Sequence, residues 1–231
     1  MKKIENSNNF FLENGYSIIE KVFSTEYCDH VINSANTIND GNSDFSPLMN
    51  PHTKSNIFLE LMSDNKILQF IEEYFDGSAI GLQTEFFFMP PKTKGFTPHQ
   101  DNTYVQADEN SFISAWVALT DVNEENGGLI IWPKSHFEKK LDTFENLSYK
   151  NHNHNQDPNA RRRTTDIPVK YKAYSPVITK GSVLMIDSWL VHASNNNISK
   201  DFRHALLCTY IKKGANFRPG NTAKRKSFDL L

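Results

Sequence analysis

Two histidines and one aspartate have the residue types and spacing of a metal-binding triad. One residue separates His99 from Asp101, and in an extended strand the side chains of residues i and i+2 point to the same side. A second imidazole could come from the distant His192. Two imidazoles and one carboxylate form the facial triad of non-haem Fe(II) oxygenases, which leaves coordination positions open. An iron site at these three residues is therefore one interpretation of the pattern.

The His-x-Asp pattern is a weak signal when it stands alone. With 8 histidines and 27 acidic residues among 231, about one His-x-Asp/Glu is expected by chance (8 × 27/231), and the chain has two. The second is His136 with Glu138. A polar loop is the structural alternative for the first pair, and a hydrogen-bonded core residue is the alternative for His192.

Ser194 and Arg203 follow His192 in the sequence and could together bind a carboxylate. Arg203 offers a planar fork of donors that matches a carboxylate bidentately. A dicarboxylic 2-oxo acid that chelates iron with its carboxylate and keto oxygens would need such a clamp for its far carboxylate. Ser194 could donate a second hydrogen bond to it. The alternative for Arg203 is a surface ion pair.

Composition excludes several function classes. The chain has 25 basic and 27 acidic residues, for a net charge of −2, which gives no electrostatic case for a nucleic-acid or membrane partner. Cys28 and Cys208 lie far apart and fit two buried thiols in a reducing compartment. The N-terminus has no apolar signal segment, and no stretch approaches the ~20 apolar residues of a membrane span. We therefore expect a cytoplasmic protein.

The periodicity of apolar residues predicts a mainly β protein with flanking N-terminal helices. Helices are expected at about residues 24–38 and 65–76, packed outside a β core, in a single domain over residues 1–231. The segment 139–172 lacks apolar periodicity, and so long a loop is often a lid or substrate loop. Strands are expected at residues 16–19, 80–89, 111–119, 129–132, 183–186 and 204–211.

Several segments in the right order resemble the phytanoyl-CoA dioxygenase family of Fe(II)/2-oxoglutarate-dependent oxygenases. Residues 11–16 (FLENGY) resemble the opening strand of that family. The resemblance covers about residues 10–212, and its further segments are 83–91, 99–104 (HQDNTY), 114–119 (SAWVAL), 126–129 (NGGL), 133–136 (PKSH) and 181–203. The distal histidine and the oxoglutarate-binding arginine of the family fall on His192 and Arg203. His136 falls on a position that is not a ligand and is expected to be structural.

The resemblance implies a double-stranded β-helix, a jelly-roll and cupin-like core, with the metal inside its mouth. Fe(II) would bind His99, Asp101 and His192, with 2-oxoglutarate and O2 at the open positions. Gln83, Trp116 and Tyr104 are further candidate cosubstrate contacts, and plain packing is the alternative for each. The Asp101 carboxylate favours hydroxylation, with desaturation or ring chemistry also open. The implied reaction hydroxylates a small-molecule metabolite and releases succinate and CO2.

The sequence leaves other interpretations open. A metal-binding jelly-roll protein without 2-oxoglutarate could be a cupin-like isomerase or a non-catalytic binding module. Residues 161–163 (RRR) are either a solvated loop or a contact for an anionic substrate, and His152 with His154 could be a second metal site. The substrate itself is not readable from the sequence.

Overall fold

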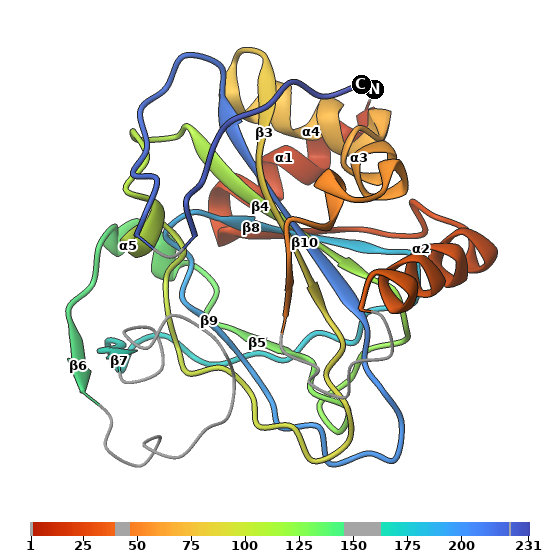
Figure 1. The fold of residues 1–231 in the computed structure, drawn as a ribbon. Coiled ribbons are helices and arrows are strands. Elements are labelled where there is room, and N and C mark those ends of the chain that lie inside the picture. Colours follow the sequence, from red (N-terminus) through yellow and green to blue (C-terminus); the bar gives the residue numbers. More distant parts are fainter. Residues whose placement is uncertain (1, 40–46, 146–162, 222) are drawn as a thin grey trace.

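Four α-helices lie in the described part of the first 75 residues. The computed structural model describes residues 2–39, 47–145, 163–221 and 223–231 (Figure 1). Ser24 caps α2 (Thr25–Ile38) by accepting a hydrogen bond from the Tyr27 amide, and Asp64 caps α4 (Asn65–Phe75) by accepting one from the Lys66 amide. The prediction of α2 and α4 is confirmed, but α1 and α3 were not anticipated. The helices are α1 (Lys2–Asn14), α2 (Thr25–Ile38), α3 (Asn56–Met62) and α4 (Asn65–Phe75).

The N-terminal segment corrects one expectation. Residues 11–14 belong to helix α1 instead of a strand, and the strand begins only at Tyr16, after Gly15. Gly15 has a φ of +79°, and a Cβ there would lie 2.5 Å from Nδ1 of His136. A side chain at this position would therefore be strained and would also clash, so the helix-to-strand turn depends on glycine.

A six-stranded antiparallel sheet forms the main wall of the molecule. Its strand order is β1-β8-β4-β10-β3-β2. Because most of the neighbouring strands are far apart in sequence, the sheet is built from crossovers, as in a jelly roll. The strands are β1 (Tyr16–Ile19), β2 (Leu48–Met49), β3 (Ala79–Phe87), β4 (Phe112–Ala118), β8 (Val183–Asp187) and β10 (Ala205–Lys212).

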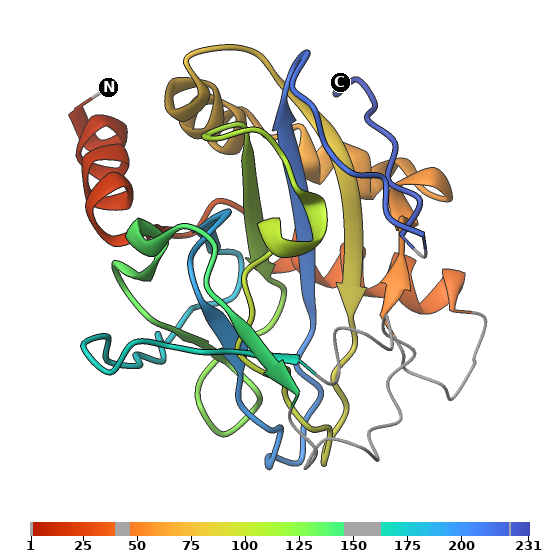
Figure 2. The same ribbon diagram turned by 90° about the vertical axis from the view of Figure 1, so that its left-hand side faces the viewer.

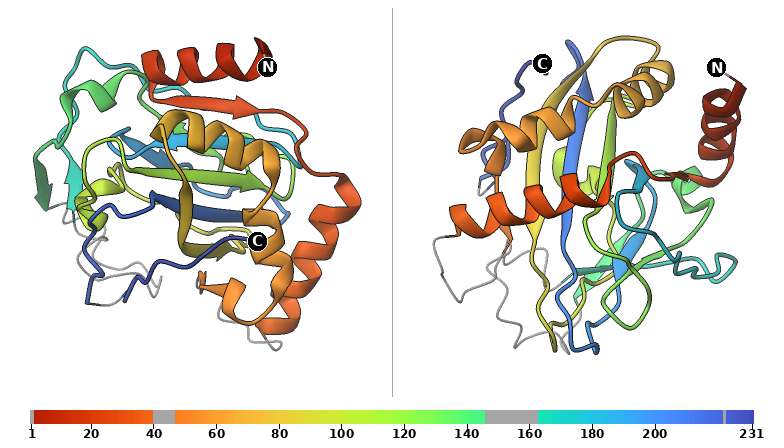
Figure 3. Two further views of the ribbon diagram at one scale, coloured as in Figure 1. Left: turned by 90° about the horizontal axis from the view of Figure 1, so that it is seen from above. Right: turned by 90° about the vertical axis from the view of Figure 1, so that its right-hand side faces the viewer.

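The two faces of this sheet have different partners. Phe86, Ala115 and Cys208 lie on the outer face, where they pack with buried residues of the helices. Figures 2 and 3 show α2, α3 and α4 along this face, with α2 crossing the strands, while α1 lies beside the β1 edge of the sheet. Trp116 and Leu184 lie on the inner face and pack with residues of a smaller sheet, β5 (Leu129–Ile131) with β9 (His192–Ser194). The inner face therefore lines the interior of the jelly roll.

Strand register aligns residues of three neighbouring strands in two rows on the inner face, one polar and one mixed. Side chains directly opposite each other in an antiparallel sheet lie on the same side, with neighbouring strands about 4.8 Å apart. The rows run across β3, β10 and β4 and consist of Gln83, Thr209 and Ser114, and then of Glu85, Leu207 and Trp116.

The segment 139–172 is partly structured. Strands β6 (Thr143–Glu145) and β7 (Arg163–Thr165) pair within it, and 3-10 helix η2 (Ser135–Glu138) precedes it. The short strands correct the expectation of a loop without secondary structure. His152, His154 and the first two arginines of residues 161–163 lie outside the described residues.

The C-terminal segment returns to the edge of the sheet beside β3. Phe228 pairs with Gly81 through backbone hydrogen bonds of 2.9 Å in both directions. Farther along, Arg218 donates hydrogen bonds from Nε and Nη2 to the carbonyl of Tyr104. Among the described residues, no helix has both the length and the apolar character needed to cross a membrane.

His204 makes the stability of the fold sensitive to acid. It lies just before β10, stacked on Phe202 at 5.6 Å, and burial together with the Arg203 charge lowers its pKa from 6.5 to about 4. As the pH decreases, this histidine is therefore protonated in the unfolded chain at a higher pH than in the folded protein. The free energy of unfolding consequently falls as the pH decreases from about 6.5 to about 4.

We predict that His204→Phe, which retains the aromatic packing, reduces the loss of stability between pH 7 and pH 5. The measurement is urea unfolding of wild-type protein and variant at both pH values. His30→Phe, on the exposed side of α2, is the matched control. The same loss in His204→Phe as in wild-type protein would contradict this account.

Candidate metal centre

Backbone pairing between two distant segments brings the two histidines together. The amides of His99 and His192 each donate to the carbonyl of the other, at 2.9 and 3.0 Å. The imidazole centroids consequently lie 4.2 Å apart. His192 begins strand β9, a strand that the sequence analysis did not predict. The triad histidines are thus fixed by main-chain hydrogen bonds before any metal binds.

Asp101 joins them from the start of a helical turn. Its backbone has a φ of −58° and a ψ of −40°, and α5 (Asn102–Val105) follows directly. The expectation that His99 and Asp101 share an extended strand is therefore wrong, because the chain turns into a helix between them. The carboxylate still reaches the histidines, with Oδ1 3.7 Å from Nε2 of His99 and 3.5 Å from Nε2 of His192.

Hydrogen bonds prepare each candidate ligand atom for a metal. Nδ1 of His99 donates to the carbonyl of Thr97 at 2.8 Å, and Nδ1 of His192 donates to that of Leu190 at 3.1 Å. A carbonyl can only accept, so Nδ1 carries the proton and Nε2 keeps its lone pair in both rings. The three ligand atoms lie within 4.8 Å of one another. This arrangement is the one that metal-ligating histidines adopt.

Ser114 orients the carboxylate, a role that the sequence analysis missed. Its hydroxyl donates to Oδ2 of Asp101 at 2.7 Å, which leaves Oδ1 turned toward the imidazoles. The signal in the sequence was a buried serine on the inner-facing register of a strand that is otherwise apolar. A hydroxyl at such a position is satisfied only by a partner inside the barrel.

The charges of the triad suit metal binding near neutral pH. Burial, assisted by His192, lowers the pKa of His99 to about 4, so this imidazole is neutral. Burial acts to raise the pKa of Asp101, but His192, His99 and the Ser114 hydrogen bond outweigh it and hold that pKa below its usual value. His99 and Asp101 are therefore already deprotonated, as metal coordination requires.

Gln100, between the ligands, has the structural role that was expected of it. Its Nε2 donates to the carbonyls of Lys139 and Trp189 at 2.7 and 2.6 Å, and its Oε1 accepts from the amide of Leu141 at 2.9 Å. These bonds connect the segment that carries His99 and Asp101 to the residues that lead into β6.

Arg203 is a buried cation without a counter-ion in the described part of the chain. Only 2% of its surface is exposed, and neither Nε nor Nη1 has a partner. Nη2 donates to Sδ of Met89, and the guanidinium lies over the Trp116 ring at 5.2 Å. Burial lowers the pKa of Arg203 to about 9. A small cavity of about 20 Å³ adjoins it, lined by Pro47, Phe87, Phe88, Met89, Thr93, Phe96 and Arg203.

The other predicted site residues occupy different positions. Ser194 is buried, and its Oγ accepts from the amide of Phe96 at 2.8 Å, so its own proton is available to a ligand. Gln83 is buried on the inner face in the row of Ser114. Tyr104 lies in α5, beyond Asp101. His136 donates from Nε2 to the carbonyl of Leu12 at 3.2 Å, in agreement with a structural role.

A second acidic residue, missed in the sequence, lies near the triad. Glu85 of β3 is partly buried, and burial together with the charge of Asp101 raises its pKa to about 7, although Arg225 opposes the rise. The signal was the alternation of β3, in which Gln83 and Glu85 share the inner face.

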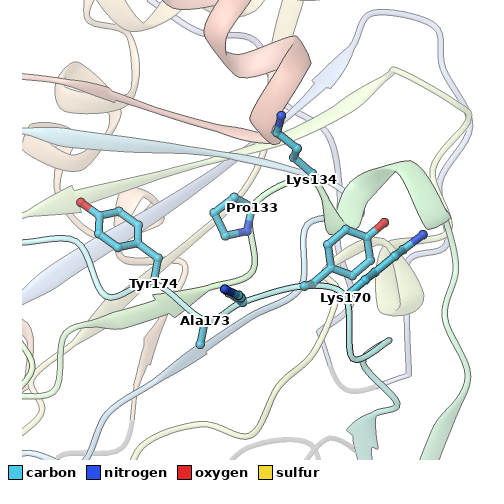
Figure 4. A pocket seen from close by; sticks show the side chains of 7 residues that line it. Pro133, Lys134, Lys170, Ala173 and Tyr174 are labelled. Carbon is cyan, nitrogen blue, oxygen red and sulfur yellow. The ribbon is translucent and has the colours of Figure 1, made fainter.

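A separate surface pocket of about 450 Å³ contains none of the triad residues (Figure 4). Two of its lysines already have partners: Lys134 pairs with Glu13 at 2.8 Å and Lys170 with Glu138 at 2.6 Å. Its lining residues are Pro133, Lys134, Lys170, Tyr171, Lys172, Ala173 and Tyr174. The candidate metal ligands therefore lie inside the barrel and not in this larger pocket.

The family model of phytanoyl-CoA dioxygenase (PhyH) matches residues 11–205. The chain belongs to this family. It is 30% identical over 148 residues to phytanoyl-CoA dioxygenase 1 of Oryza sativa, which covers 63% of this chain and 50% of that protein. It is 24% identical over 165 residues to the peroxisomal phytanoyl-CoA dioxygenase of Bos taurus, covering 66% and 45%. The chain thus spans about half the length of these curated relatives.

Solved structures confirm the double-stranded β-helix fold. The nogalamycin-pathway epimerase SnoN, in complex with Fe3+, alpha ketoglutarate and nogalamycin RO, superposes with a TM-score of 0.76 at 17% identity, covering 96% of this chain and 88% of that one. EctD from S. alaskensis, with 2-oxoglutarate and 5-hydroxyectoine, gives a TM-score of 0.71 at 17% identity, covering 92% and 77%. The predicted mainly β core with external helices is confirmed.

We predict that Ser114→Ala weakens metal binding by about 10–100-fold, because partners that orient ligands typically contribute this much. The affinity for Mn(II), a redox-stable probe, would be measured by competition with a chelator. Ser78→Ala, at an exposed position, is the matched control. An unchanged affinity in a folded Ser114→Ala protein would remove Ser114 from the site.

Proposed function

We propose that this chain is an Fe(II)- and 2-oxoglutarate-dependent oxygenase that hydroxylates a small molecule. The carrying observation is the pairing of a two-histidine, one-carboxylate cluster with a buried, uncompensated arginine on the wall of one barrel. A protein that bound only a metal would have no use for that arginine. The proposal therefore rests on both features together.

One set of residues fits iron, and a second set fits the cosubstrate. Imidazole and carboxylate ligands with open positions suit non-haem Fe(II), and His99, Asp101 and His192 would hold it. Arg203 has two unpartnered nitrogen atoms in a buried position, where an unsatisfied charge is costly. A carboxylate is the group that satisfies a guanidinium fork best. When bound, iron and 2-oxoglutarate together with O2 supply the oxidising power and release succinate and CO2.

The chain itself positions the cosubstrate and shields it from water. Arg203 would bind the far carboxylate, which displaces the weak thioether acceptor of Met89. Ser194 would donate to the same carboxylate, while the Trp116 ring supports the guanidinium. We propose Gln83, on the inner face, as a further polar contact and Tyr104 as a residue of the substrate entrance. A fixed donor set of this kind costs little reorganisation on binding.

The paired strands β6 and β7 belong to segment 139–172, the proposed substrate loop. The amide of Thr165 donates to the carbonyl of Pro98 at 2.9 Å, and Oγ1 of Thr97 donates to the carbonyl of Arg163 at 3.2 Å. These bonds attach β7 to the two residues that precede His99. Structured chain from this segment therefore lies against the metal-binding segment, where a loop can shape the access of a small molecule.

We predict that Arg203→Gln weakens 2-oxoglutarate binding to the Mn(II)-loaded protein by about 10–100-fold. A hydrogen bond to a charged group contributes about 1.5–3 kcal/mol, and a tenfold change is about 1.4 kcal/mol. Calorimetric titration measures the affinity. Arg163→Gln, at an exposed arginine, is the matched control.

The same variant separates binding from folding. Without 2-oxoglutarate, Arg203→Gln should not be less stable than wild-type protein, because it removes a buried charge that has no counter-ion. Equal 2-oxoglutarate affinity in the folded variant and in wild-type protein would contradict the proposed role of Arg203.

A further inference from the structure

Glu85 is an acidic residue on the inner wall that the proposed reaction does not use. It lies directly opposite Leu207 of β10, which is itself opposite Trp116 of β4. Two strand spacings, about 10 Å, therefore separate its backbone from that of the strand that carries Ser114. The Glu85 carboxyl shares the barrel interior with Asp101, and the two charges act on each other.

In the described part of the chain, the Glu85 side chain makes no hydrogen bond and no ion pair. The cation that acts on both acidic groups is Arg225, on the C-terminal segment at the edge of β3. That charge does not compensate the effects of burial and of Asp101 on Glu85. A partly buried carboxyl without a partner is unfavourable unless a ligand satisfies it.

The charge balance of the loaded site indicates what that ligand is. A divalent iron, the Asp101 carboxylate, doubly negative 2-oxoglutarate and Arg203 together have no net charge. When it is ionised, the Glu85 carboxylate adds a negative charge on the inner face of the sheet. Because like charges repel in a water-poor interior, this charge disfavours an anionic substrate and favours a cationic one.

We propose that Glu85 binds a protonated amine of the substrate and so selects a cationic small molecule over an anionic one. This inference rests on the proposed function, because it assumes that the substrate lies beside the iron and 2-oxoglutarate. Glu85 is a specificity residue in this proposal: its carboxylate accepts hydrogen bonds from the ammonium group, which places the neighbouring carbon atoms near the triad. Gln83, the proposed polar contact of 2-oxoglutarate, lies two residues away on the same face, so a group bound to Glu85 would lie beside the cosubstrate.

The test uses matched probes on one carbon skeleton. Wild-type protein is loaded with Fe(II) and 2-oxoglutarate under argon, and the charge-transfer band of the chelate is recorded. Benzylamine, cyclohexylmethylamine and n-butylamine are then titrated against benzoate, cyclohexanecarboxylate and butyrate, up to 50 mM. Perturbation of the band measures probe binding without turnover. We expect at least one amine to bind about tenfold or more tightly than the carboxylate with the same skeleton, which corresponds to about 1.4 kcal/mol.

The variant Glu85→Gln preserves the size of the side chain and removes its charge. We expect it to lose this preference for amines while its chelate band and its affinity for 2-oxoglutarate stay within twofold of wild-type protein. Glu73→Gln, at an exposed glutamate of α4, is the matched control and should behave as wild-type protein. The unchanged chelate band shows that the variant is folded and loaded.

Three results would overturn the inference. The first is tighter or equal binding of the carboxylates in wild-type protein, and the second is no response to any amine although the chelate band is present. The third is an amine preference that persists in Glu85→Gln. A wild-type protein that binds Fe(II) but gives no chelate band with 2-oxoglutarate would instead contradict the proposed function, and the inference with it.

Discussion

The antiparallel backbone bridge between His99 and His192 is the constraint on which the site depends. It joins the segment before α5 to strand β9, two parts of the chain that are far apart in sequence. Each ring donates from Nδ1 to a main-chain carbonyl two residues earlier, so the same local geometry is used twice. Since main-chain hydrogen bonds set both rings, the metal centre is organised by the fold and needs only Asp101 and its partner Ser114 to complete it.

Two charged residues of the inner wall lie near that centre. Arg203 is buried without a counter-ion at one side, and Glu85 is partly buried without a partner at another. Each is a cost to the free protein, and each is relieved by a ligand of opposite charge. We therefore propose that the fold prepares two recognition sites of opposite sign beside one metal centre. The Arg203 site suits the far carboxylate of 2-oxoglutarate, and the Glu85 site suits a cationic group on the substrate.

The candidate triad was predictable from the sequence because the prediction depends on the residue types of the ligands and not on their exact secondary structure. The expectation of an extended strand at Asp101 was wrong, yet the residue reaches the same place from a helical turn. Helices α2 and α4 were predictable from their caps and periodicity, whereas α1 is too polar to show a clear apolar stripe. The bridge at His192 depends on a three-residue strand, which is too short to give a periodic signal. Ser114 and Glu85 required the register of the sheet, which only the structure supplies.

The central claim is that one site holds Fe(II) and 2-oxoglutarate together. Its most direct test is an anaerobic titration of metal-free protein with Fe(II) and then with 2-oxoglutarate, followed by visible absorption. We expect a metal-to-ligand charge-transfer band that appears only when both are present and is lost in His99→Ala. Protein that is folded and binds Fe(II), but forms no band with 2-oxoglutarate, would contradict it and would favour a metal-binding jelly roll that uses no such cosubstrate.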